Sequence, residues 1–114
     1  MILAFTVTAN DSNASMDPRF GRAKSILITD ENFNGPIYLS TDEITAGAHG
    51  AGPRMAQLIA EHKVEVLITG NGPGGNASAL LSRMGTKVFT YSGEITAQEA
   101  FTQWKKGELT PFTL

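Results

Sequence analysis

Cysteine is absent from the 114-residue sequence. Disulfide bonds are therefore impossible, and thiolate ligation of zinc or of an iron–sulfur cluster is excluded. The chain also lacks an apolar run long enough to cross a bilayer. Its start, MILAFTVTAND, has neither the basic segment nor the small-residue cleavage site of a secretory signal peptide. We therefore expect a cytoplasmic protein without a membrane segment.

Charge of one sign does not dominate either, since the formal net charge at pH 7 is -2. This balance gives no bulk attraction to nucleic acid or to an anionic membrane, so neither is expected as a partner and any anion binding must be local. The hydrophobic fraction of 41% is ordinary for a soluble globular protein. Without a repeat, a low-complexity tract or a linker, the chain is expected to form a single domain over residues 1–114.

Short apolar runs predict five strands, at residues 2–8, 25–29, 36–40, 64–69 and 87–91. The fourth and fifth strands are separated by a helical segment and should be parallel, whereas the short link between the second and third favours an antiparallel hairpin. The first strand is apolar on both faces and belongs in the middle of the sheet. The predicted fold is therefore α/β, with a five-stranded mixed sheet in the order 3-2-1-4-5 in which strand 2 is antiparallel to the rest.

Apolar residues at helical spacing predict about three helices, at residues 53–62, 77–84 and 96–106. Pro53 suits the first turn of a helix, and Gly85 is typical of a helix end. Thr96 and Glu99 have the spacing of a capping box.

Three unusual loops are expected to meet at one edge of this sheet: NDSNASMDPRFGR (10–22), TAGAHGAG (45–52) and GNGPGGNA (70–77). Open α/β sheets bind ligands at the carboxyl ends of the strands where the strand order reverses, which here is the crevice between the first and fourth strands. Helices beginning after Pro53 and Gly75 would direct N–H groups and positive dipole ends at it. Formal positive charge would come from Arg19, Arg22, Lys24 and Arg54. The sequence therefore predicts an anion-binding pocket.

The stretch ITGNGPGGNA (68–77) leaves the kind of anion open. Gly70, Gly72 and Gly75 satisfy the G-x-G-x-x-G dinucleotide pattern, and Glu94 lies near the position of a ribose-binding acid. However, the glycines follow the fourth strand instead of the first strand of a complete nucleotide-binding half. A P-loop is excluded because no G-K-[ST] follows. A tight turn that packs a strand closely against a helix would explain the same glycines.

Three ordered motifs resemble the dinitrogenase iron-molybdenum cofactor biosynthesis family, of the NifX, NafY and NifB C-terminal type. They are MDPRFGRA with its continuation SILITD, AHGAGPRMAQLI, and LITGNGPGGNASALLSRMGTKVF; the ending EAFTQWKKGEL also fits. The resemblance spans essentially the whole chain. It implies a ribonuclease H-like α/β fold and a nitrogenase accessory-like protein that binds or carries a metal–sulfur cluster without catalysing turnover. One branch of the family, the orange proteins, holds a molybdenum–copper sulfide cluster non-covalently.

On this resemblance the glycine loop becomes a cradle for an inorganic anion, either a molybdenum–copper sulfide cluster or an iron–molybdenum cofactor precursor. The candidate cluster-binding residues are Asp17, Arg19, Phe20, Gly21, Arg22, Lys24, His49, Arg54, Gly72, Gly74, Gly75 and Asn76. Arg22 is the leading anion contact. Asp17 and Arg19 could instead pair within their own loop, and Phe20 is expected to be buried beneath it.

Three soft donors, His49, Met16 and Met55, are candidate ligands for copper(I). Each also has an ordinary structural explanation. Met55 lies on the apolar face of its helix and fits a core position, Met16 fits an anchor for its loop, and His49 fits a surface position or a helix-terminus hydrogen-bond donor.

Other function classes stay open. A metal-dependent nuclease of ribonuclease H-like fold needs clustered carboxylates for magnesium, whereas basic residues predominate at the predicted edge. A nucleotide-binding module, or a regulatory module that docks on an ATPase or a cofactor-assembly protein and carries no cluster, is the main alternative. The sequence does not choose between a monomer and a weak dimer, and it does not imply nitrogen fixation.

Overall fold

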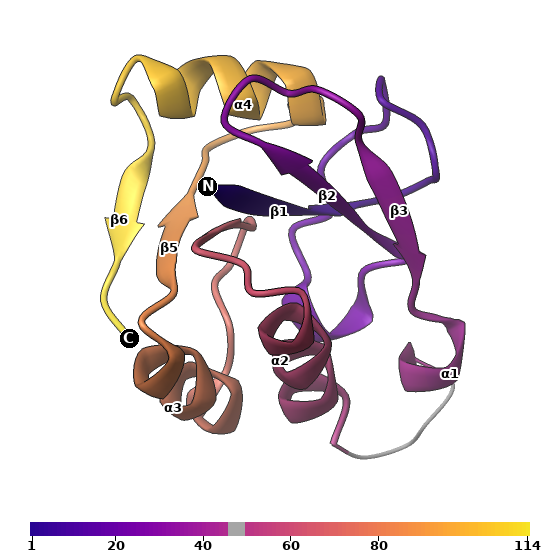
Figure 1. Ribbon diagram of the computed structural model, residues 1–114, viewed down its shortest axis with the longest axis vertical. Coiled ribbons are helices and arrows are strands. Elements are labelled where there is room, and N and C mark those ends of the chain that lie inside the picture. The colour runs from indigo at the N-terminus through magenta and orange to yellow at the C-terminus, as the bar shows by residue number, and fades with distance from the viewer. Residues whose placement is uncertain (46–49) are drawn as a thin grey trace.

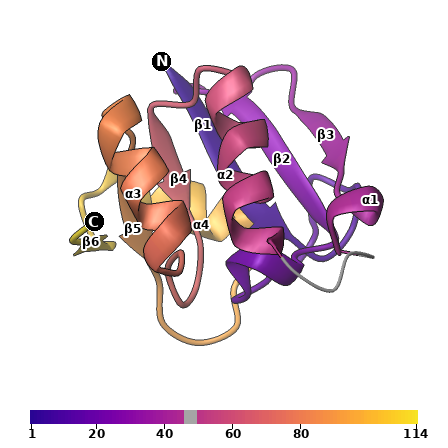
Figure 2. The same cartoon turned by 90° about the horizontal axis from the view of Figure 1, so that it is seen from below.

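A computed structural model describes residues 1–45 and 50–114 of the chain. Its centre is a six-stranded mixed sheet in the order β3-β2-β1-β4-β5-β6 (Figures 1 and 2). The strands are β1 (Ile2–Val7), β2 (Ser25–Asp30), β3 (Ile37–Ser40), β4 (Val66–Ile68), β5 (Lys87–Thr90) and β6 (Thr110–Phe112). The helices are the short 3-10 turn η1 (Phe20–Arg22), α1 (Asp42–Thr45), α2 (Ala51–Glu61), α3 (Gly75–Met84) and α4 (Ala97–Lys105).

Helices cover both faces of the sheet, with α2 and α3 on one side and α4 on the other (Figures 1 and 2). Successive residues of β1 alternate between the two resulting cores, because side chains of a strand point to opposite faces. Ala4 packs with Met55 of α2 and Leu81 of α3. Its neighbour Phe5 packs with Ala100 of α4 in the second core. An apolar run on both faces is what a central strand between two helical layers requires.

The predicted strand order and directions are confirmed for the first five strands. β1 is antiparallel to β2 and parallel to β4, so that Phe5 stands opposite Leu27 on one side and Ile68 on the other. β2 and β3 are antiparallel, and β4 and β5 are parallel. The carboxyl ends of β1, β4 and β5 therefore lie along the same edge of the sheet. We call this the carboxyl edge.

A sixth strand corrects the five-strand prediction. β6 pairs antiparallel with β5 and places Val88 opposite Phe112. Its sequence, Thr-Pro-Phe, is too short to give an alternating pattern, and a proline normally argues against a strand because it has no N–H to donate to a ladder. Proline is tolerated at a sheet edge, and the edge of the sheet is where β6 lies.

The helix prediction also needs correction, since the described residues contain a fourth α-helix. α1 is only four residues long and begins with Asp42 and Glu43, where acidic side chains favour a helix start. α2 begins at Ala51, two residues before Pro53. The capping box of α4 is confirmed: the Glu99 N–H donates to Thr96 Oγ1 over 3.1 Å, and the Thr96 N–H donates to Glu99 Oε1 over 3.0 Å. None of the helices in the described part of the chain has the length and apolarity needed to span a bilayer.

Candidate functional site

The three predicted loops meet at the carboxyl edge. The Asn71 N–H donates to the Pro18 carbonyl over 2.9 Å, which joins the glycine loop to the first loop. Arg22 Nη1 donates to the Thr45 carbonyl over 3.0 Å at the end of α1. A Cβ at Gly21 would lie 3.4 Å from the Gly52 nitrogen, so η1 packs directly on the first turn of α2. These contacts confirm the predicted meeting of the loops for the residues that the structure describes.

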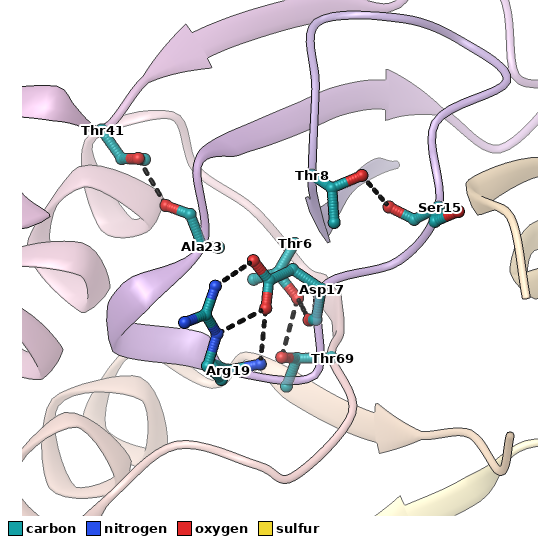
Figure 3. A network of polar contacts seen from close by, with 8 residues as sticks. All are labelled: Thr6, Thr8, Ser15, Asp17, Arg19, Ala23, Thr41 and Thr69. Atoms are coloured by element: carbon teal, nitrogen blue, oxygen red, sulfur yellow. Dashed lines mark hydrogen bonds and ion pairs between the residues drawn. The ribbon is translucent and has the colours of Figure 1, made fainter. Parts of the chain in front are cut away.

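The crevice between β1 and β4 is filled by the chain itself. The Asp17 N–H donates to the Thr6 carbonyl, and Thr6 Oγ1 donates to the Asp17 carbonyl, both over 2.8 Å. Thr6 Oγ1 also lies 2.8 Å from Thr69 Oγ1, directly after β4 (Figure 3). Since Pro18 then bonds to Asn71, the segment 17–18 crosses the carboxyl ends of both strands. A ligand at this edge must therefore bind outside that segment, not deep between the two strands as the topology alone suggests.

Asp17 and Arg19 form an ion pair within their loop (Figure 3). The Asp17 side chain is 1% exposed and accepts from the Arg19 backbone N–H, Nε and Nη2 over 3.0, 3.1 and 3.2 Å. The hydrogen bond to Asp17, together with its negative charge, raises the pKa of the Arg19 guanidinium above its usual value. The alternative that these residues pair with each other is confirmed, so most of the charge of Arg19 is already balanced.

The other basic residues lie in different surroundings. Arg22 is exposed, and its guanidinium donates to a neutral carbonyl without an ion pair among the described residues. Lys24 is exposed and precedes Ser25, which pairs with Val7 at the carboxyl edge. Arg54 instead lines a hollow of about 410 Å³ between α1 and α2, where Glu43 and Glu61 supply opposite charge. The positive charge at the edge therefore comes from Arg22 and Lys24.

Several predicted ligands are placed in the cores. Phe20 is 4% exposed and packs with the α2 and α3 helices, as expected for a residue beneath its loop, so its ring does not face a ligand. Met55 is fully buried in that same core, whereas Met16 is buried in the core beneath α4. The sheet separates the two sulfur atoms, which excludes them as ligands of one metal ion. His49 lies outside the described residues, one position before Gly50.

The first turns of α2 and α3 lie side by side (Figure 2). A Cβ at Gly52 of α2 would be 3.8 Å from the Cβ of Ala77 in α3. The N-cap residues, Gly50 and Gly74, provide no side-chain hydrogen bond, and neither first turn contains an acidic residue. The first N–H groups of a helix have no partner within it, and each helix start carries roughly half a positive charge. Two such starts side by side form a small electropositive surface, whose first N–H donors have no acceptor among residues 1–45 and 50–114.

This surface has room above it. A Cβ at Gly74 or Gly75 would meet no atom within 4 Å from other segments that the structure describes, and Gly74, Gly75 and Asn76 are all exposed. The exposed donors are the N–H groups of Gly75 and Asn76, with the Asn76 amide beside them. We call the first turns of α2 and α3 together with Arg22 and Lys24 the helix-start cradle. Exposed N–H donors with positive charge nearby are groups that suit an anion.

The family model described as dinitrogenase iron-molybdenum cofactor matches residues 1–107. The chain belongs to this family. Among solved structures, it is similar to the apo form of the orange protein from Desulfovibrio gigas, with 28% identity and a TM-score of 0.88 over 98% of this chain and 96% of that one. It is also similar to a NifB-like protein from Thermotoga, with 30% identity and a TM-score of 0.81 over 99% of this chain and 97% of that one. No curated protein matches the sequence.

Membership of this family and the two relatives support a role as a cofactor-related binding protein. The helix-start cradle fits a cofactor-related role better than it fits dinucleotide binding. Glu94, the candidate ribose-binding acid, lines a separate hollow of about 310 Å³ with Met16, whose side chain belongs to the α4 side of the sheet. The described residues also contain no group of three or more His, Asp or Glu side chains arranged to hold a metal, which a magnesium-dependent nuclease would need.

Two features of this family member were not predicted. Tyr91 also lines the hollow that contains Glu94, and burial together with the negative charge of Asp17 raises the pKa of its hydroxyl to about 12. Phe112 of β6 lies against Gly72 in the glycine loop. The sequence contains little information about either feature, because each joins segments that are distant in the chain and depends on where β5 and β6 end.

Proposed function

We propose that this protein binds an anionic metal–sulfur cluster as cargo at the helix-start cradle and carries it without catalysing a reaction. The observation that carries the proposal is the pair of adjacent helix starts, α2 and α3, with no capping side chain and no acidic residue in either first turn. α4 offers a contrast in the same chain, because its N-cap Thr96 accepts from the Glu99 N–H and Glu99 accepts from the Thr96 N–H. The donors of α2 and α3 are left for a ligand, and an anion there is stabilised by about 0.3–1 kcal/mol per exposed helix start.

The residues at the cradle suit a bulky cluster with spread-out charge. Backbone N–H groups of Gly75 and Asn76 would donate to sulfide or oxo groups, and Arg22 and Lys24 would balance the negative charge at longer range. The sequence has no cysteine, so the cluster would be held by these contacts and not by thiolate bonds. Weak, numerous contacts favour exchange of cargo over permanent binding, which is what a carrier needs.

The identity of the cargo follows from the family resemblance. It is a molybdenum–copper sulfide cluster or an iron–molybdenum cofactor precursor, and the ribonuclease H-like label for the fold rests on the same resemblance. Of the three candidate soft donors, we retain His49 as the candidate metal ligand, because it comes one residue before Gly50, the N-cap of α2. Met16 and Met55 are set aside because they are buried in opposite cores.

An anaerobic titration of isotope-labelled protein with copper(I) and tetrathiomolybdate tests the proposal. We expect a new visible charge-transfer band, with amide NMR shifts concentrated at residues 10–24, 46–54 and 70–76. NAD serves as a parallel ligand. Shifts of the glycine loop with NAD alone, and no band with the metals, would favour the nucleotide-binding alternative and overturn the proposal.

Substitution of Arg22 tests how much its side chain contributes to cluster binding. Arg22→Ala should weaken cluster uptake while leaving the fold unchanged, because the side chain is exposed and makes one hydrogen bond to a carbonyl. Arg83→Ala is the matched control, since Arg83 is exposed in the last turn of α3, at the far end of the same helix. Equal uptake by the two variants would remove Arg22 as the leading contact.

A further inference from the structure

The ring of Phe112 occupies the space where a side chain at position 72 would stand. Gly72 has a φ of +80°, in the left-handed region, and a Cβ there would overlap the Cε2, Cζ and Cδ2 atoms of the Phe112 ring. Phe112 is two residues from the last residue of the sequence and is half-buried against the core beneath α2 and α3. The glycine loop and the C-terminal strand are therefore in direct contact, although Gly72 and Phe112 are 40 positions apart in sequence.

The contact matters because it falls between the two hydrogen bonds that hold the loop. Before Gly72, the loop is held by the hydrogen bond from Asn71 to Pro18. After it, Ser78 Oγ in the first turn of α3 donates to the carbonyl of Pro73, which precedes the helix, over 3.1 Å. Gly72 is the flexible point between these two attachments, since glycine in the left-handed region has no side chain of its own to restrict it. The Phe112 ring supplies that restriction from outside.

The pairing of β6 with β5 holds the Phe112 ring in place. Phe112 is opposite Val88 in the ladder between β6 and β5, and Val88 is 2% exposed in the core beneath α2 and α3. β5 in turn is paired with β4, the strand from which the glycine loop leaves. Phe112 thus links the outermost strand of the sheet to the loop that precedes α3.

We propose that Phe112 is a positioning residue for the anion site: by packing on Gly72 it sets the direction in which the glycine loop enters α3, and so aims the N–H groups of Gly75 and Asn76 at the cargo. Phe112 itself does not touch the cargo. This proposal rests on the proposed function, because it deepens the account of how that cradle is formed.

The test compares Phe112→Ala with two other variants. Phe112→Leu keeps an apolar side chain on Gly72, and Phe101→Ala removes a half-buried aromatic ring from the opposite core, beneath α4. Phe101→Ala therefore reproduces a general loss of packing without altering the glycine loop. The measurements are amide hydrogen exchange at residues 70–77 and the dissociation constant for tetrathiomolybdate alone, both taken well below the unfolding transition.

We expect Phe112→Ala to accelerate exchange at residues 70–77 and to weaken tetrathiomolybdate binding about fivefold, which corresponds to the loss of one well-aligned hydrogen bond. Phe112→Leu should restore most of the affinity, and Phe101→Ala should leave it unchanged. Wild-type exchange and affinity in Phe112→Ala, or an equal loss in Phe101→Ala, would overturn the positioning role. If the wild-type protein fails to bind tetrathiomolybdate both with and without copper(I), the proposed function fails, and the exchange rates alone decide whether Phe112 orders the loop.

Discussion

Replacing Gly70 by alanine tests whether the filled crevice holds the carboxyl edge together. A Cβ at Gly70 would lie 2.5 Å from Pro18 Cα, 2.7 Å from Pro18 Cβ and 3.0 Å from the Tyr91 hydroxyl oxygen. Non-bonded carbon atoms normally approach to about 3.5–4.0 Å, so the Pro18 backbone would have to move by about 1 Å. The two nearest obstacles belong to a proline, which has little freedom to give way.

The expected loss of stability follows from these contacts. Overpacking of this kind destabilises by about 1–3 kcal/mol, and loss of the hydrogen bond from Asn71 to Pro18 adds about 1 kcal/mol. Gly70→Ala should therefore lower the free energy of unfolding by about 2–4 kcal/mol. At about 4 °C per kcal/mol for a domain of this size, the melting temperature should fall by about 8–16 °C. Urea denaturation and calorimetry measure the two quantities.

Gly75→Ala is the matched control in the same loop. Outside its own helix, no atom of the described residues lies within 4 Å of a Cβ at this position, and Gly75 is the first residue of α3. Alanine is favoured over glycine in a helix by up to about 1 kcal/mol, so this variant should be as stable as the wild type or slightly more stable. Wild-type stability in Gly70→Ala, or a comparable loss in Gly75→Ala, would refute the account of the crevice.

Three further substitutions follow from contacts described above. The raised pKa of Tyr91 means that, at alkaline pH, the folded state keeps a proton that the unfolded state has lost. The contribution of the Tyr91 hydroxyl to the stability of the folded state is therefore present below pH 10.0 and is lost as the pH rises towards about 12. The free energy of unfolding, measured in urea across this pH range, should fall less in Tyr91→Phe than in the wild type. Tyr38→Phe leaves Tyr91 as the one tyrosine of the sequence, so a phenolate titration at about 10 in that variant would contradict the raised pKa. Thr96→Ala should cost about 1 kcal/mol in thermal unfolding by removing the cap of α4, with Thr96→Ser near wild type. Arg19→Ala should lower the melting temperature, because it leaves the buried Asp17 carboxylate without its counter-charge. Arg19→Ala should keep its cluster uptake, whereas Arg22→Ala should lose it. An equal loss of uptake in the two variants would show that Arg19 also contributes to the site.

Local patterns in the sequence were sufficient for most of the sheet and for the helix ends. β1 is apolar at successive positions, which fixed it in the centre, and the strand order followed from the lengths of the connections. The Thr96 and Glu99 spacing gave the capping box, because both partners lie within one helical turn. The meeting of the three loops also followed from topology, since it requires only that the directions of the strands are known.

The contacts that decide the site were beyond such patterns. The segment 17–18 fills the crevice, where hydrogen bonds join Thr6 to Asp17 and Thr6 to Thr69. These partners are 11 and 63 positions apart in sequence, and no local period encodes such contacts. β6 was missed because three residues with a central proline carry no strand pattern. Helical spacing placed Met55 on an apolar face, but only the packing reveals that Met16 lies in the other core.

The two ends of the chain are unequal places for a purification tag or a fluorescent label. The Met1 amino group pairs with Glu31 over 3.0 Å at the amino end of β1, across the sheet from the carboxyl edge. Leu114 stands two residues beyond Phe112 and helps to line a hollow of about 400 Å³ with it. Anything attached after Leu114 therefore begins beside the ring that rests on the glycine loop. A dye placed there would sense that loop directly, whereas a tag intended to be silent belongs at the N-terminus.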